Sequence, residues 1–220
     1  FDRQLLWQLS SYSLMALVST VLGPLVYVQV RNLVIGQLGL VQAGYWEAMT
    51  RISSYYFLFI ATLLSVYFLP KLAEAKTNKA TQQIFFTYYK AVLPLFILGL
   101  FTLYVGRNLW VPLLFSKDFA PVTDLFFWQM VGDVFKAASL ILGYQFFAKK
   151  MTLAFILCEL ASLSAFYIAT LICLPRFQLQ GVVMAQAFAY MGYFFLSYYS
   201  ELEPKYFYFS KHPFLRYFFL

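Results

Sequence analysis

Residues 124–150, DLFFWQMVGDVFKAASLILGYQFFAKK, combine an apolar run long enough to cross a membrane with two ionisable residues near its middle. The run ends in paired lysines, so we interpret it as a transmembrane helix. Asp133 and Lys136 are three residues apart. Three residues make nearly one helical turn, so both side chains point the same way. A charge at this depth costs roughly 3 kcal/mol, so it normally faces protein or water.

Small and polar residues continue this face of the helix: Gln129, Gly132, Ser139 and Gly143. Two interpretations of the face are open. In the first, Asp133 and Lys136 form an ion pair that only fastens the helix to its neighbours. In the second, which we favour, the face is the polar lining of a transport cavity.

The composition is that of an integral membrane protein. Of the 220 residues, 62% are hydrophobic and only 11% are charged, whereas a soluble domain carries about 25% charged residues. The net charge of +7 does not argue for a nucleic-acid partner, because the basic residues lie mainly at the ends of apolar runs. With one histidine and no CxxC motif, we expect no metal site and no cofactor. Hydrolase and nucleotide-binding motifs are also lacking, so we do not expect an enzyme.

Six apolar runs are candidates for spanning a bilayer, which takes about 20 residues each. They cover roughly residues 5–38, 44–69, 84–105, 121–147, 151–174 and 181–199. The first run is too long for one straight span, and Gly23 and Pro24 at its middle predict a kink or break. We expect the second run to stop at Pro70 and the fifth at Pro175. The predicted fold class is an all-α membrane protein with about six transmembrane helices in one bundle.

We assign residues 1–200 to this bundle and residues 201–220 to a basic, aromatic tail on the membrane surface. With the N-terminus in the cytoplasm, ten lysines and arginines fall in inner segments and three, Arg107, Lys117 and Arg176, in outer ones. The positive-inside rule therefore predicts that both ends of the chain are cytoplasmic. Because the chain starts with phenylalanine and shows no signal peptide, we expect it to be a piece of a longer protein.

Two arginines lie inside the predicted spans. Arg31, in the outer half of the first span, either snorkels to the surface or faces a cavity. Arg51, in the second span, precedes hydroxyl side chains on one helical face: Ser54, Tyr55, Thr62 and Ser65. That face either packs helices together or lines a polar cavity, and the arginine favours the cavity.

Acidic residues offer partners for these cations. Glu47 lies one turn before Arg51, at the i,i+4 spacing of an ion pair. Glu159, in the fifth span, is a candidate for proton or sodium coupling, or alternatively a partner for Lys136. Buried cations facing one cavity suit an anionic ligand, and arginine suits phosphate because its planar fork donates two parallel hydrogen bonds. Broken helices with cavity-facing charges are typical of secondary transporters.

Two segments resemble the polysaccharide flippases of the Wzx type. LLSVYFLPKLAEA (63–75) looks like a pattern in the second half of these proteins, and DLFFWQMVGDVFKA (124–137) is similar to them more closely. The group includes the O-antigen translocases and the flippase of enterobacterial common antigen. It belongs to a superfamily with the MATE-type multidrug antiporters and the lipid II flippase.

The resemblance implies about twelve helices in two six-helix bundles that face each other across a central cavity. This chain would be the C-terminal bundle, and its partner would be the missing N-terminal half. Such proteins translocate undecaprenyl-pyrophosphate-linked oligosaccharide across the bacterial inner membrane by alternating access, with the lipid tail left among the membrane lipids. By position, Arg31, Arg51, Asp133 and Lys136 would line the cavity, with Gln129 on the same face.

We therefore predict that Arg51 and Lys136, with Arg31, bind an anionic headgroup. Asp133 would pair with Lys136 in one state and release it in the other. Gly23 and Pro24 would form the bending point of the first helix.

Two rival functions stay open at this stage. A MATE-like multidrug or cation antiporter half calls for a net acidic cavity, whereas the intramembrane basic residues are at least as many as the acids. An integral-membrane transferase of lipid-linked glycan synthesis needs acidic residues at a loop edge, which only Asp118 and Asp124 approach.

Overall fold

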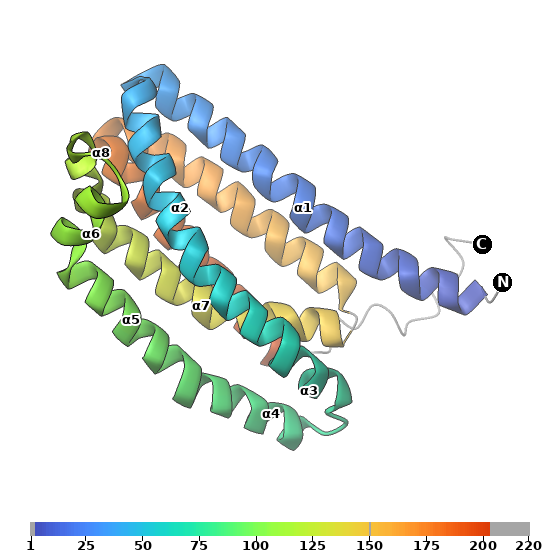
Figure 1. The fold of residues 1–220 in the computed structure, drawn as a ribbon. Coiled ribbons are helices and arrows are strands. Elements are labelled where there is room, and N and C mark those ends of the chain that lie inside the picture. Colours follow the sequence, from blue (N-terminus) through green and yellow to red (C-terminus); the bar gives the residue numbers. More distant parts are fainter. Residues whose placement is uncertain (1–2, 150, 203–220) are drawn as a thin grey trace.

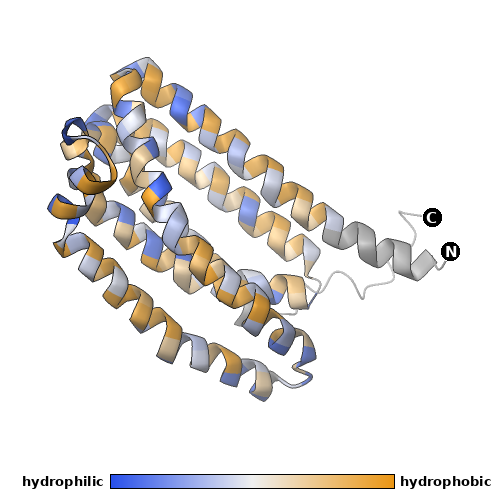
Figure 2. Cartoon of the chain, in the orientation of Figure 1, coloured by the Kyte–Doolittle hydropathy of each residue, from blue (hydrophilic) through white to orange (hydrophobic). Residues whose placement is uncertain are grey.

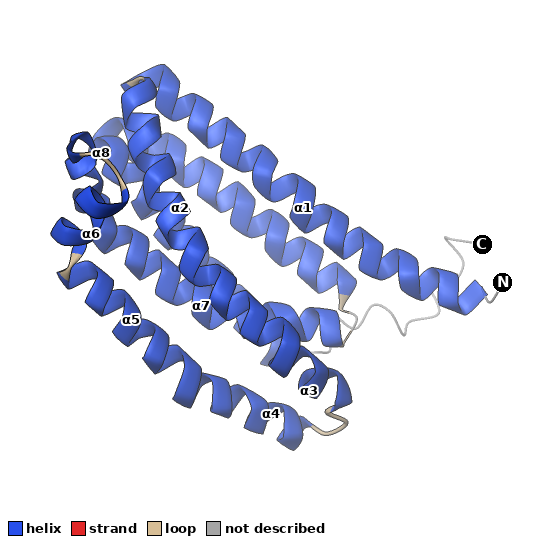
Figure 3. Ribbon diagram, in the orientation of Figure 1, coloured by secondary structure: helices blue, strands red, loops and turns tan. Residues whose placement is uncertain are grey.

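The structure is a computed structural model that describes residues 3–149 and 151–202. Within these ranges it consists of helices joined by short turns, without strands (Figure 3). The α-helices are α1 (Arg3–Leu38), α2 (Leu40–Leu63), α3 (Leu69–Glu74), α4 (Asn78–Thr87), α5 (Leu93–Val105), α6 (Arg107–Leu114), α7 (Phe126–Ala148) and α8 (Thr152–Leu202). Two π-helical segments, η1 (Leu64–Phe68) and η2 (Tyr88–Val92), and one 3₁₀ segment, η3 (Lys117–Leu125), complete the chain. Residues 203–220 of the predicted tail lie outside the described residues.

Five helical stretches of the described chain are long and apolar enough to cross a membrane. They are Ser13–Leu38, Leu40–Glu74, Lys79–Val105, Lys117–Ala148 and Thr152–Tyr199, and apolar residues run along each of them (Figure 2). The last has 48 residues, about 70 Å of helix, which is twice the thickness of a bilayer core. It changes direction at Gln178, where φ is 52° and ψ is −137°. The prediction of an all-α membrane bundle is confirmed.

Prolines are accommodated inside these stretches rather than ending them. Pro70 and Pro94 each lie two residues after a π-helical segment. Proline has no N–H, and its ring clashes with the carbonyl four residues earlier. In both places the residue before the proline bonds the carbonyl five residues back, and this wider turn relieves the clash. The prediction that the second span stops at Pro70 is wrong, because the helical stretch continues to Glu74.

The helices also continue through the other two prolines at which a break was predicted. α1 is continuous for 36 residues through Gly23 and Pro24, and it runs as one long rod along the edge of the bundle (Figure 1). The expected break is absent, and a bending role for these residues stays a prediction. α8 likewise passes Pro175 and turns only at Gln178. Gly181 permits that turn, because a Cβ there would lie 2.3 Å from the carbonyl oxygen of Cys173.

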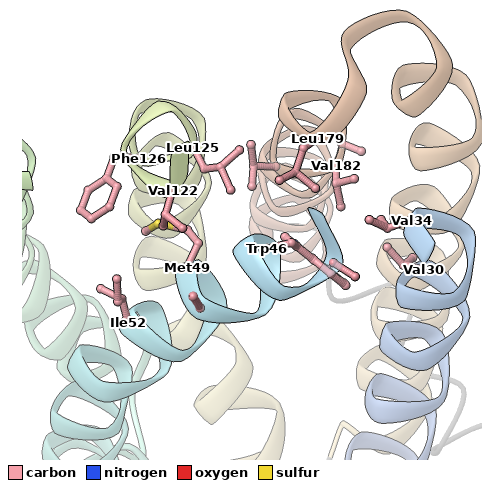
Figure 4. Close-up of a cluster of buried hydrophobic side chains, with 14 of the residues drawn as sticks. Val30, Val34, Trp46, Met49, Ile52, Val122, Leu125, Phe126, Leu179 and Val182 are labelled. Atoms are coloured by element: carbon pink, nitrogen blue, oxygen red, sulfur yellow. The ribbon is translucent and has the colours of Figure 1, made fainter. Parts of the chain in front are cut away.

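α7 is the most deeply buried of the spans and organises the bundle. It packs mainly against α8, and α2, α3 and α5 contact it as well. At Gly132 the contact with α8 is nearly backbone to backbone, since a Cβ would lie 2.9 Å from the Cα of Ala187. Near the α1–α2 turn, a core joins α1, α2, η3 and the second half of α8 around Trp46 and Met49 (Figure 4). This packing fixes the rotation of α2, which contributes residues to both polar groups described next.

Candidate functional site

Two groups of polar side chains meet at different faces of α2, each with members on a second helix. The first, here called the surface cluster, consists of Arg31, Glu47 and Arg51. The second, the interior cluster, consists of Ser53, Tyr56, Gln129 and Asp133. Arg51 and Ser53 are two residues apart, so about 160° separates them around the helix axis. The predicted set of site residues is thus divided between two faces and does not line one cavity within this chain.

One carboxylate joins the two arginines of the surface cluster. Glu47 Oε1 lies 3.1 Å from Arg51 Nη2, and Oε2 lies 3.5 Å from Arg31 Nε. The i,i+4 pair predicted for Glu47 and Arg51 is confirmed. The Arg51 side chain remains 65% exposed, so most of its donors are open. The surface cluster therefore presents a net positive charge on an exposed helix face.

The hydroxyl stripe that follows Arg51 lies on this exposed face. Ser54, Tyr55, Thr62 and Ser65 are all exposed. The hydroxyls of Ser54 and Thr62 donate to carbonyls one turn earlier on α2. Their hydrogen bonds therefore do not join α2 to another helix of this chain. Between them the face is apolar, with Leu58 and Phe59 exposed. Polar and apolar side chains therefore alternate along this exposed face of α2.

Asp133 is fully buried at the centre of the interior cluster. Its Oδ2 accepts hydrogen bonds from the Ser53 hydroxyl, at 2.8 Å, and from the Tyr56 hydroxyl. Its Oδ1 accepts one from Gln129 Nε2 at 3.1 Å. Such partners make a buried carboxylate tolerable in an apolar setting. The carboxylate thereby fastens α2 to α7.

Lys136 lies beside the interior cluster, between aromatic rings rather than against a carboxylate. Its Nζ is 4.4 Å from the ring centre of Phe57 and 5.2 Å from that of Tyr190. It interacts electrostatically with Asp133 and Glu159, but in the described part of the chain the direct ion pairs are those of the surface cluster. The Asp133–Lys136 pair is not formed in this structure, and its formation in another state stays a prediction.

The small and polar face of α7 is packed against its neighbours. Gln129, Gly132 and Ser139 are buried along with Asp133. Ser139 donates to the carbonyl of Lys136 on its own helix at 2.9 Å. The favoured interpretation of this face, a cavity lining, does not match its tight packing against α2 and α8. Whether Arg31, Arg51, Gln129, Asp133 and Lys136 bind a substrate, and whether Glu159 couples an ion, stay predictions.

The structure adds two residues that the sequence reasoning missed. Ser53 and Tyr56 are three residues apart on α2, so they share a face. Their common partner, Asp133, lies 80 and 77 residues later in the chain. The available signal was two hydroxyl residues on the face of α2 opposite Arg51, in an otherwise apolar run.

The chain is similar to two curated proteins described as Lipid III flippase. One is from Escherichia coli (strain K12) and the other from Shigella flexneri. Each is 32% identical over 196 residues, which are 89% of this chain and 47% of the relative. The chain thus spans about half the length of the curated relatives it matches. No protein-family model and no solved structure matches it.

Proposed function

We propose that this chain is one half, the C-terminal bundle, of a flippase for lipid-linked oligosaccharide in the bacterial inner membrane. The similarity to Lipid III flippases over most of the chain supports this proposal, as does the all-helical membrane bundle. The substrate would be an oligosaccharide on undecaprenyl pyrophosphate, moved by alternating access. The partner would be an N-terminal half that supplies the facing wall of the cavity, with both ends of this chain cytoplasmic.

The exposure of Arg51 inside an apolar span is the single observation that carries the proposal. Arg51 lies in the helical stretch Leu40–Glu74, which is long and apolar enough to cross a membrane, and follows the start of α2 by eleven residues. Its side chain is 65% exposed, and an arginine that faces lipid within the hydrocarbon core costs roughly 3 kcal/mol or more. A water-filled cavity shared with the missing half removes that penalty, because it hydrates the guanidinium.

The surface cluster is the proposed site for the pyrophosphate. Glu47 holds the two guanidinium groups on one side of the cavity, and the exposed donors of Arg51 suit bidentate contacts with phosphate oxygens. The neighbouring hydroxyls and the exposed ring of Tyr55 suit a sugar.

The interior residues take other parts in this proposal. Asp133 holds α2 and α7 together by accepting from Ser53 and Tyr56, and Gln129 donates to its other oxygen from one turn earlier on α7. Lys136 becomes a second cation for the headgroup if α2 moves away from α7. Glu159, which interacts electrostatically with Lys136, couples this movement to an ion, and Gly23 and Pro24 allow α1 to bend.

Replacement of Arg51 with alanine in the full-length protein tests this proposal. We expect export of lipid-linked oligosaccharide to fall at least about tenfold, the effect of losing one charge-assisted contact, while the amount of protein in the membrane stays unchanged. The matched control is Arg107→Ala, because Arg107 stacks on Tyr104 outside the surface cluster. Normal export by the Arg51 variant would contradict the proposal. Efflux of cationic drugs or turnover of a lipid-linked donor by the purified protein would instead support the antiporter or the transferase.

A further inference from the structure

A pocket of about 330 Å³ opens at the end of the bundle where α3 and α4 meet. Its lining includes Tyr67, Phe68, Lys71, Glu74, Ala80 and Ile84. Lys71 follows Arg51 by twenty residues, about 30 Å of helix, so the pocket is separate from the surface cluster. In Figure 1 the α3–α4 turn lies toward the same end of the bundle as the α7–α8 turn.

A lysine is held over the pocket by an aromatic ring. Lys71 Nζ donates to the Tyr67 hydroxyl at 2.6 Å and lies 3.9 Å from the centre of the same ring. An ammonium group has three donors, so two remain for a ligand. Both side chains are exposed, and no ion pair involving Lys71 occurs among the described residues. The pocket therefore contains an ammonium group that Tyr67 holds in place and that has two unused hydrogen-bond donors.

A carboxylate lies one helical turn away on the same side of α3. Glu74 follows Lys71 by three residues, is exposed and lines the same pocket. The pocket thus offers one positive and one negative group that are not joined to each other. Its remaining wall is largely apolar, through Phe68, Ala80 and Ile84.

The surroundings of the pocket suit a lipid more than a free ion. Tyr67, which lines the pocket, and the preceding Val66 are exposed large apolar or aromatic side chains. On α4, Phe86 is also exposed, with Lys90 Nζ 5.4 Å from the centre of its ring. Aromatic residues followed one turn later by lysine fit the boundary between acyl chains and headgroups. Lys149, which donates to the carbonyl of Ala75 at 2.5 Å, adds a further cation at this end.

We propose that this pocket binds the headgroup of a phospholipid that carries both a phosphate and an amine, such as phosphatidylethanolamine. Lys71 binds the phosphate and Glu74 binds the ammonium group, while the apolar wall and the exposed rings contact the glycerol and acyl chains. The carboxylate selects against headgroups that bear only negative charge. This site does not depend on the proposed flippase function, since it uses none of the residues of the surface cluster.

Lipid binding by the purified full-length protein in detergent, measured by native mass spectrometry, tests the proposal. The probes are phosphatidylethanolamine and phosphatidylglycerol with identical acyl chains, and inorganic phosphate as a competitor. We expect the wild type to bind the ethanolamine lipid about tenfold more tightly, which is the effect of one charge-assisted contact. Lys71→Gln should weaken binding of both lipids about tenfold, and Glu74→Gln should abolish only the preference between them.

Lys76→Gln is the matched control, because Lys76 is an exposed lysine at the same end that does not line the pocket. Unchanged lipid affinity in Lys71→Gln, with an unchanged melting temperature, would overturn the proposal. Equal affinity of the wild type for the two lipids would overturn the role of Glu74. Displacement of the lipid by millimolar inorganic phosphate would show a simple anion site in place of a lipid site.

Discussion

The surface cluster and the interior cluster come within two residues of each other on α2, at Arg51 and Ser53, yet their surroundings are opposite. In the surface cluster two arginines share one carboxylate, and their side chains are 42% and 65% exposed. In the interior cluster the carboxylate of Asp133 is fully buried and both of its oxygens accept hydrogen bonds. A charged residue in an apolar helix is therefore not by itself a binding site. The contacts already made by the charge decide whether it is available to a ligand.

Replacement of Asp133 with alanine should have the largest effect on stability. It leaves the donors of Ser53, Tyr56 and Gln129 without their acceptor in a dry interior. Each unsatisfied donor costs about 1–3 kcal/mol, so we expect a loss of several kcal/mol and less folded protein in the membrane. Thermal unfolding in detergent measures this change.

Asp124→Ala is the control for that experiment, because Asp124 is exposed just before α7. If Asp133→Ala unfolded at the wild-type temperature but no longer exported substrate, the interior cluster would be a functional site. The interior cluster could then no longer be distinguished from the surface cluster as a purely structural group.

Replacement of Glu47 with glutamine should have a much smaller effect on stability. The pairs of Glu47 with Arg31 and Arg51 are partly exposed, and such pairs contribute about 0–1 kcal/mol. The same change raises the net positive charge beside Arg51, so the full-length protein should bind its anionic substrate more tightly and release it more slowly. Single-turnover and steady-state transport assays separate binding from release. A destabilisation as large as that of Asp133→Ala would show that the surface cluster is structural.

The sequence predicted the spans well, because length and hydropathy alone decide them. It also predicted the Glu47–Arg51 pair, which is a contact within one helix. It did not predict that the helices continue past Pro24, Pro70 and Pro175. At Pro70 a wider turn just before the proline keeps the stretch helical. Periodicity shows which residues share a face, as for Gln129 and Asp133. It does not show whether that face meets water or a neighbouring helix.

The roles of the two faces of α2 depend on whether each face meets water or a neighbouring helix. Ser53 and Tyr56 look like ordinary packing residues until α7 is placed beside them. Arg51 is expected to line one cavity with Asp133 and Lys136 until the rotation of α2 is known. Both uncertainties concern contacts between residues far apart in the chain, such as the 80 positions between Ser53 and Asp133. Sequence patterns within one helix carry no information about such contacts.

Labelling of single cysteines shows whether the Arg51 face of α2 lines a water-filled cavity. Arg51→Cys, Tyr55→Cys and Leu98→Cys would each be introduced into a cysteine-free full-length protein and treated with a membrane-impermeant thiol reagent. Leu98 is the control, since it is exposed on the apolar helix α5. We predict rapid labelling at positions 51 and 55, slowed by lipid-linked oligosaccharide at position 55, where Arg51 is intact, and none at position 98. Equal lack of labelling at all three positions would contradict the proposed cavity, because Arg51 would then face lipid.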